Sequence, residues 1–187
     1  LANEINTEIV KSINESGGKA IGLSGNKNTL LSASKLKIEV KGSDSNIEKL
    51  VDIGFVGQPT KVNTNFIKKR INDGNIPVIA PLGIDEEGNS YNINADTAAG
   101  FIAGELEASK LLLLTDVPGI LDQDKKLISS LTLDDASKII DEDFIVGGMK
   151  PKILTCVEAM KKGVNKTTIL DGRIPHSVVL ELFTEHG

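Results

Sequence analysis

Three polar segments of the chain carry residue types suited to phosphate chemistry. Residues 92–96 read Asn-Ile-Asn-Ala-Asp, residues 112–122 read Leu-Leu-Leu-Thr-Asp-Val-Pro-Gly-Ile-Leu-Asp, and residues 147–152 read Gly-Gly-Met-Lys-Pro-Lys. An amide side chain can hold a carboxylate or acyl group of a substrate, and a carboxylate can hold a lysine. A flexible lysine ammonium can follow the charge on a phosphoryl group during its transfer.

Each segment also has a purely structural explanation. Asn or Asp before a helix is often its N-cap, but a cap needs only one of Asn92, Asn94 and Asp96. The Pro-Gly pair at 118–119 is typical of a β-turn, although ligands in open α/β sheets also bind beyond the carboxyl ends of strands. Lysines at a helix start are either solvated or face an anion such as phosphate. No GxxxxGK[ST] stretch is present, which excludes a P-loop.

The elements that would position these segments alternate along the chain. Hydrophobic spacing and capping signals predict helices, strands and one hairpin, which together indicate an α/β fold with a largely parallel sheet and local hairpins. The helices are expected over residues 1–15, from a cap at Asn63 or Thr64 to residues 73–74, and over 95–107, 133–140, 149–162 and 176–184. The strands are expected over residues 19–24, 36–40, 76–80, 111–114 and 167–170, with a β-rich stretch through 54–57 and the hairpin across 84–93.

Composition excludes several classes of protein. The 187 residues are 40% hydrophobic, enough to bury a sizeable core, and no apolar run reaches the roughly 20 residues of a membrane span. A net charge of −5, scattered lysines and 3% aromatic residues argue against nucleic-acid binding. The single cysteine, Cys156, has no Cys or His partners at metal-ligand spacing, so we expect no metal site and a cytoplasmic protein.

At the three polar segments the chain resembles the amino acid kinase superfamily, and within it the acetylglutamate kinases. The resemblance extends over nearly the whole chain, and the combination of the first two segments is far more specific than either alone. It implies a three-layer α/β/α sandwich with a mainly parallel central sheet and β-hairpins. Residues 1–100 would form the remainder of an acceptor-binding lobe and residues 101–187 an ATP-binding lobe. The further matching segments are residues 54–57, 60–63, 77–83, 171–176 and 180–184.

The resemblance also implies a reaction and its residues. Such enzymes transfer the γ-phosphoryl group of ATP to the γ-carboxylate of N-acetyl-L-glutamate, the second step of arginine biosynthesis, with Mg²⁺ carried by the nucleotide. Asn92 would bind N-acetylglutamate, Lys152 would neutralise charge on the phosphoryl group, and Asp96 would orient the catalytic lysines. The nucleotide-binding residues would be Asp116, Val117, Pro118, Gly119, Ile120, Leu121, Phe144, Ile145 and Val146.

The chain departs from the family pattern at its ends. The family's lysine-bearing first strand, glycine-rich loop and substrate-binding arginine would all precede Leu1, and the chain stops directly after a helical pattern. We therefore expect a fragment that does not catalyse the reaction by itself. The tail around His176 and Glu181 resembles the arginine-sensitive branch, whose members are hexamers inhibited by arginine. A homo-oligomer, either dimer or hexamer, is the corresponding expectation.

Two alternatives stay open. The first keeps the fold and changes the acceptor, as in glutamate 5-kinase, aspartate kinase or uridylate kinase; the residues at 117–120 and the pair Asn92 and Asn94 favour acetylglutamate. The second is a non-catalytic regulatory module with a nucleotide pocket. The presence of both Asp96 and Lys152 argues against it, because a simple binding module needs neither in a phosphoryl-transfer arrangement.

Overall fold

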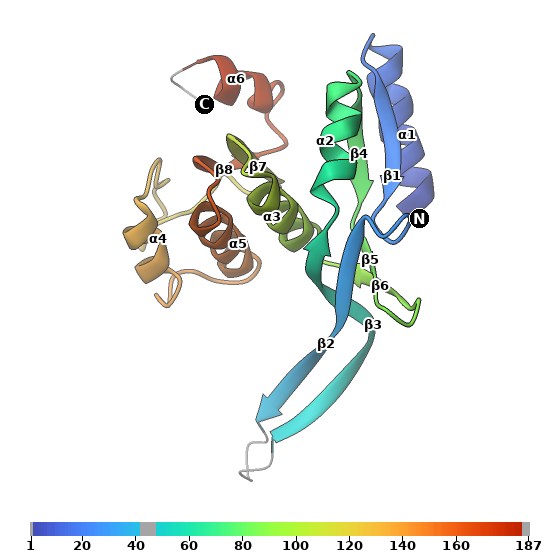
Figure 1. Cartoon of the computed structure of the whole chain (residues 1–187). Helices are drawn as coiled ribbons and strands as arrows, with labels where there is room; N and C mark the ends of the chain where they lie inside the picture. Colours follow the sequence, from blue (N-terminus) through green and yellow to red (C-terminus); the bar gives the residue numbers. More distant parts are fainter. Residues whose placement is uncertain (1, 42–47, 185–187) are drawn as a thin grey trace. The chain divides into compact units, whose positions relative to one another are not determined.

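A computed structural model describes residues 2–41 and 48–184 of the chain (Figure 1). The chain divides into two compact units, Leu1–Ala98 and Ala99–Gly187. Helix α3 begins in the first unit and continues into the second. Each unit is described by itself below.

The first unit combines a parallel strand pair with a small barrel. Strands β1 and β4 pair in parallel, and β2, β3, β6 and β5 close into a barrel in that order. Its elements are α1 (Ala2–Glu15), β1 (Ala20–Ser24), β2 (Leu31–Lys41), β3 (Glu48–Val62), α2 (Thr64–Asn72), β4 (Ile76–Ala80), β5 (Leu82–Ile84), β6 (Ser90–Ile93) and the start of α3 (Ala95–Leu106).

The helices of this unit begin and end at the residues that sequence signals predict. Helix α1 stops before Gly17, whose φ of +88° suits glycine far better than any other residue. The Asn63 side chain caps α2 by accepting a hydrogen bond from the backbone N–H of Phe66 at 3.0 Å. Gly74, with a φ of +80°, follows the end of α2 and leads into β4. The expected cap at Asn63 is therefore present, and a glycine with positive φ follows the end of each helix.

The barrel is more extensive than the sequence indicates. Strands β2 and β3 form a long antiparallel arm in Figure 1, where the sequence predicts a strand over residues 36–40 and a β-rich stretch through residues 54–57. Strand β6 lies between β3, which it pairs in parallel, and β5, which it pairs antiparallel. Leu31 and Ile93 are buried in this unit, at 0% and 1% exposure. Closure depends on pairing between distant segments, which local patterns do not encode.

The second unit packs helices against a parallel strand pair. Strands β7 and β8 run in register from the pair Lys110 and Lys166 to the pair Thr115 and Asp171. The carboxyl ends of both strands therefore meet at one edge. The elements of this unit are the rest of α3, β7 (Lys110–Thr115), α4 (Leu133–Ile139), α5 (Met149–Lys161), β8 (Lys166–Asp171) and α6 (Ser177–Phe183).

Two apolar clusters stabilise the second unit. One is formed by Ala103, Leu111, Leu113, Cys156, Ala159 and Val164. The other is formed by Ile145, Ile153 and Val157. Cys156 is thus a buried core residue, as its place on the apolar stripe of α5 predicts. The α/β class, with parallel strand pairs, helices and hairpins, is confirmed.

The start of α6 differs from expectation. His176, the first residue of the helix expected over 176–184, occupies the N-cap position with a left-handed φ of +63° and makes no capping hydrogen bond through its side chain. The helix begins instead at Ser177. Among the helices within residues 2–41 and 48–184, none has the length and apolar character needed to cross a membrane.

Candidate active site

A cavity of about 290 Å³ lies at the carboxyl end of β7 in the second unit. Three separate stretches of sequence contribute to it: the loop after β7, the segment between α4 and α5, and the first turn of α5. Seven of the nine predicted nucleotide-binding residues line it, together with the predicted catalytic lysine. The lining residues are Thr115, Asp116, Val117, Gly119, Leu121, Phe144, Ile145, Val146, Gly148, Met149 and Lys152.

The loop after β7 folds back on itself as a narrow hairpin. Leu121 and Leu127 form an antiparallel bridge, and the backbone N–H of Ile128 donates to the carbonyl of Ile120 at 2.8 Å. Gly119 adopts a φ of +138°, and a Cβ there would lie 2.8 Å from a methyl of Leu127. The close approach of Gly119 to Leu127 therefore leaves no room for a side chain at position 119.

Pro118 and Ile120 are the two predicted nucleotide residues that do not line this cavity. Both line a second, larger cavity of about 570 Å³ instead. Ile120 also packs against the apolar cluster of Ile145, Ile153 and Val157. The residues from Asp116 to Leu121 therefore do not all line the same cavity. The sequence gives no sign of this difference.

Lys152 lies in the first turn of α5 and is half-buried at the 290 Å³ cavity. Gly148, the N-cap residue, makes no side-chain cap, and the backbone N–H of Met149 donates to the Val146 carbonyl at 3.4 Å. A helix N-terminus disfavours a cation and favours an anion. A phosphate bound here would gain from both the helix start and the lysine. Lys150, in contrast, is exposed, pairs with Asp141 at 3.5 Å and is not among the lining residues.

The segment between α4 and α5 gives the cavity an apolar wall. Ile145 is only 7% exposed and packs against Ile153 and Val157, which anchors the segment to α5. Val146, the next residue, is 70% exposed and contributes to the lining. An apolar wall beside a few polar groups is the usual composition of a site for a small molecule.

In the first unit the structure separates the three polar residues at 92–96. Asn94 is the cap of α3, since its side-chain oxygen accepts from the backbone N–H of Thr97 at 3.1 Å. Asn92 belongs to β6 and is exposed, while its neighbours Tyr91 and Ile93 are buried. Asp96 lies in the first turn of α3, where the helix dipole favours a carboxylate. Asn92 is therefore free of any capping role.

A charged pair at the carboxyl end of β8 was not singled out by sequence reasoning. The buried Asp171 carboxylate accepts two hydrogen bonds from the Arg173 guanidinium, at 2.9 and 2.7 Å, and one from its backbone N–H at 2.9 Å. These bonds, with the Arg173 side chain contributing most, lower the pKa of Asp171 to about 2. The backbone N–H of Gly172 donates to the Thr115 carbonyl at 2.8 Å, which ties the end of β8 to β7. The Asp-Gly-Arg sequence directly after a strand was the available signal.

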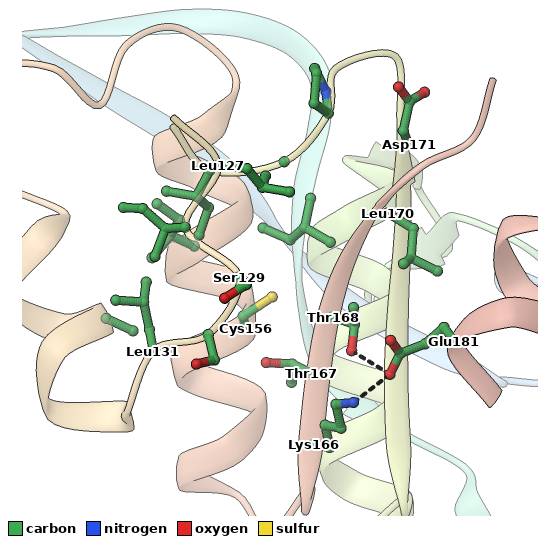
Figure 2. A pocket seen from close by; sticks show the side chains of 18 of the residues that line it. Leu127, Ser129, Leu131, Cys156, Lys166, Thr167, Thr168, Leu170, Asp171 and Glu181 are labelled. Carbon is green, nitrogen blue, oxygen red and sulfur yellow. Dashed lines mark hydrogen bonds and ion pairs between the residues drawn. The ribbon is translucent and has the colours of Figure 1, made fainter. Parts of the chain in front are cut away.

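Figure 2 shows the second cavity, which has a charged end and apolar walls. The Lys166 ammonium lies 2.6 Å from the Glu181 carboxylate, and the Thr168 hydroxyl donates to the same carboxylate at 3.1 Å. The Glu181 side chain is only 3% exposed, and the bond from Lys166 contributes most to lowering its pKa. Leu127, Leu131 and Leu170 are among the apolar residues around it. No group of three or more His, Cys, Asp or Glu side chains suited to a metal occurs among the residues that the structure describes.

Comparison with known proteins identifies the family. Residues 1–171 match the model of the amino acid kinase family, and the chain belongs to this family. Acetylglutamate kinase of Nitrobacter hamburgensis is 51% identical over the whole chain, which covers 63% of that protein. Acetylglutamate kinase of Rhodospirillum centenum is 52% identical, with 61% covered. The chain thus spans about three fifths of these relatives.

A solved structure has a similar fold. The crystal structure of N-acetylglutamate synthase from Neisseria gonorrhoeae, complexed with coenzyme A and L-arginine, aligns with a TM-score of 0.74 and 28% identity. The alignment covers 91% of this chain and 36% of the synthase. The likeness supports the fold expected from the family and concerns only part of the synthase.

Proposed function

We propose that the complete protein containing this chain uses ATP to phosphorylate the γ-carboxylate of N-acetyl-L-glutamate. One observation carries the proposal: Asp116, the segment 144–146 and Lys152 come together around a single cavity at the carboxyl end of a parallel strand. This is where open α/β sheets bind ligands. The two relatives named acetylglutamate kinase, at 51% and 52% identity, support the choice of acceptor.

The cavity fits a nucleotide chemically. Its apolar wall would take the base, and the uncapped start of α5 with Lys152 would take the phosphates. Mg²⁺ bound to ATP would neutralise part of the phosphate charge. Lys152 would stabilise the negative charge that develops on the phosphoryl oxygens during transfer. Such stabilisation acts in the transition state and raises the rate more than it tightens binding.

Residues of the first unit would serve the acceptor. The exposed amide of Asn92 offers both a donor and an acceptor, which suits the acetamido group or a carboxylate of N-acetylglutamate. Asp96 would orient the catalytic lysines through its carboxylate, which lies in the first turn of α3. The assignment of acceptor binding to residues 1–100 and of ATP binding to residues 101–187 is part of this proposal.

Regulation by arginine and assembly into a dimer or hexamer belong to the same proposal. The synthase with 28% identity was crystallised with L-arginine. In this chain the part that resembles the arginine-sensitive branch is the tail around His176 and Glu181. We also place the complete protein in the cytoplasm, as expected for an enzyme with one buried cysteine. Arginine titration of the complete enzyme, with an unchanged rate, would remove the regulatory part.

The reaction is tested by measuring ADP release from the purified complete protein with ATP and a panel of acceptors. We expect turnover with N-acetyl-L-glutamate and none with glutamate, aspartate or UMP. Turnover with one of the other acceptors instead would favour another member of the superfamily. ATP binding without turnover on any acceptor would favour the non-catalytic regulatory module.

A further inference from the structure

One carboxylate holds the hairpin that presents Asn92. Asp85, at the start of the turn between β5 and β6, accepts hydrogen bonds from the backbone N–H groups of Glu87 and Asn89 at 3.0 and 2.8 Å. It also accepts from the Asn89 side-chain amide at 3.0 Å and from the Tyr91 hydroxyl at 2.8 Å. Four donors from three residues of one hairpin therefore converge on a single side chain.

Only an ionised carboxylate matches this set of donors. A carboxylate accepts about four hydrogen bonds and donates none, whereas an amide has one accepting oxygen and a nitrogen that donates. The bonds, of which the one from the Asn89 side chain contributes most, lower the pKa of Asp85 below its ordinary value. Hydrogen bonds to a charged acceptor are also stronger than neutral ones. An asparagine at this position would keep Oδ1 for the two backbone N–H groups, but its Nδ2 would face the Asn89 amide nitrogen where the carboxylate offers an acceptor.

The bond to Tyr91 extends the network into the barrel. Tyr91 is 6% exposed, and its ring lies 6.4 Å from that of Phe55. Gly57 leaves the space for it, since a Cβ there would lie 2.7 Å from the Tyr91 Cβ. Successive side chains of a strand point to opposite faces. Fixing Tyr91 on the barrel side of β6 therefore fixes Asn92 on the exposed side.

We propose that Asp85 is a positioning residue for the acceptor, holding β6 in the register where Asn92 pairs with Val56 of β3 and Leu82 of β5. A slip of one residue would exchange the faces of Tyr91 and Asn92. The inference rests on the proposed function, in which Asn92 binds N-acetylglutamate. It assigns Asp85 an effect on acceptor binding and none on the phosphoryl-transfer step.

The kinetic test uses Asp85→Asn and the milder Tyr91→Phe in the complete enzyme, with both substrates varied. Asp85→Asn should raise the KM for N-acetylglutamate about tenfold, the effect of losing one charged hydrogen bond. Tyr91→Phe should raise this KM by a smaller factor, and both variants should keep kcat and the KM for ATP within about twofold of wild type.

Asp122→Asn is the matched control. Asp122 also accepts hydrogen bonds from two backbone N–H groups of a turn, those of Asp124 and Lys126 at 2.8 and 2.9 Å, but belongs to the second unit. Its replacement should leave the KM for N-acetylglutamate unchanged. A raised acceptor KM in this control, equal to that of Asp85→Asn, would show a general effect of losing a turn carboxylate and would overturn the inference.

A second measurement is independent of catalysis. Hydrogen exchange followed by mass spectrometry should show faster exchange over residues 90–93 in both hairpin variants than in wild type or in Asp122→Asn. Unchanged exchange there, or an unchanged acceptor KM in an active enzyme, overturns the positioning role and leaves the proposed function standing. If wild type itself shows no turnover with N-acetylglutamate, the proposed function fails, and with it the role of Asp85 toward that acceptor.

Discussion

Lys150 and Lys152 are separated by one proline in the sequence, yet their surroundings differ. Lys152 lines the proposed nucleotide cavity, whereas Lys150 is exposed and pairs with Asp141. Residue type and spacing alone could not distinguish them, because the side that each faces depends on how α5 packs. Their contrast allows a direct test of the proposed chemistry.

In the complete enzyme, Lys152→Ala should lower kcat by about 10²- to 10³-fold, the usual cost of removing one group that stabilises transition-state charge. The KM values for both substrates should change by only a few-fold, because ground-state binding uses the lysine less. Steady-state kinetics measures both quantities. Lys150→Ala is the control and should retain near-normal kcat; an equal loss in both variants would contradict a specific role for Lys152.

The pair Asp171 and Arg173 predicts a dependence of stability on pH. The pKa of the Asp171 carboxyl is lowered from an ordinary 3.8 to about 2, chiefly by hydrogen bonds from Arg173. The unfolded chain therefore binds a proton more readily than the folded one between these values. The stabilisation is complete above about pH 4 and is lost as the pH falls toward 2.

Asp171→Asn should remove this contribution. Urea unfolding of the chain and the variant between pH 7 and pH 2 would show a constant stability difference at neutral pH that shrinks below about pH 4. Other carboxylates with lowered pKa values, such as Glu181, are present in both proteins. Their contributions to the pH dependence of stability therefore cancel when the two proteins are compared. If the stability difference between the two proteins does not change with pH, the pair does not contribute to the pH dependence of stability.

At the scale of elements, local signals predicted most helices and strands within one or two residues of their observed ends. Asn63 and Gly74 are examples, since each acts through bonds or dihedral angles of its immediate neighbours. The barrel was not predicted, because closure joins Val56 of β3 to Asn92 of β6, which lie far apart in the sequence. The burial pattern of one strand does not indicate which other strand it pairs with.

The barrel leaves no room for a side chain at Gly57, and a substitution can test this. A Cβ at this position would lie 2.7 Å from the Tyr91 Cβ and 3.1 Å from the Ser34 carbonyl oxygen, so Gly57→Ala requires backbone movement. We expect a loss of about 1–3 kcal/mol in the free energy of unfolding. Gly172→Ala, whose Cβ would meet its nearest atoms at 3.4 Å, should cost less. Chemical denaturation measures both, and equal costs would argue against tight packing at Gly57.

At the scale of the whole molecule, the chain forms two compact units and spans about three fifths of its relatives' length. The predicted acceptor residue Asn92 belongs to the first unit, and the proposed nucleotide cavity belongs to the second. The proposed function therefore assigns one substrate to each unit. This division can be tested by a pair of substitutions.

In the complete enzyme, Asn92→Ala should raise the KM for N-acetylglutamate about tenfold and leave the KM for ATP near normal. Asp116→Ala, in the proposed nucleotide cavity, should instead raise the KM for ATP and leave the KM for N-acetylglutamate near normal. Steady-state kinetics with both substrates varied measures the two KM values in each variant. An unchanged acceptor KM in Asn92→Ala would remove Asn92 from the acceptor site, and equal effects of each variant on both constants would contradict the division.

The sequence by itself determined the α/β class, the positions of the helices and most strands, and the residue types able to handle phosphate. These follow from hydrophobic period, capping and turn chemistry, which act between neighbours in the chain. Tertiary structure alone decided that Asn94 is the cap and Asn92 is not, and that Pro118 and Ile120 line a different cavity from Asp116. It also revealed the hydrogen bonds of Asp85 and Asp171. These features depend on which face each side chain takes once distant segments pack together.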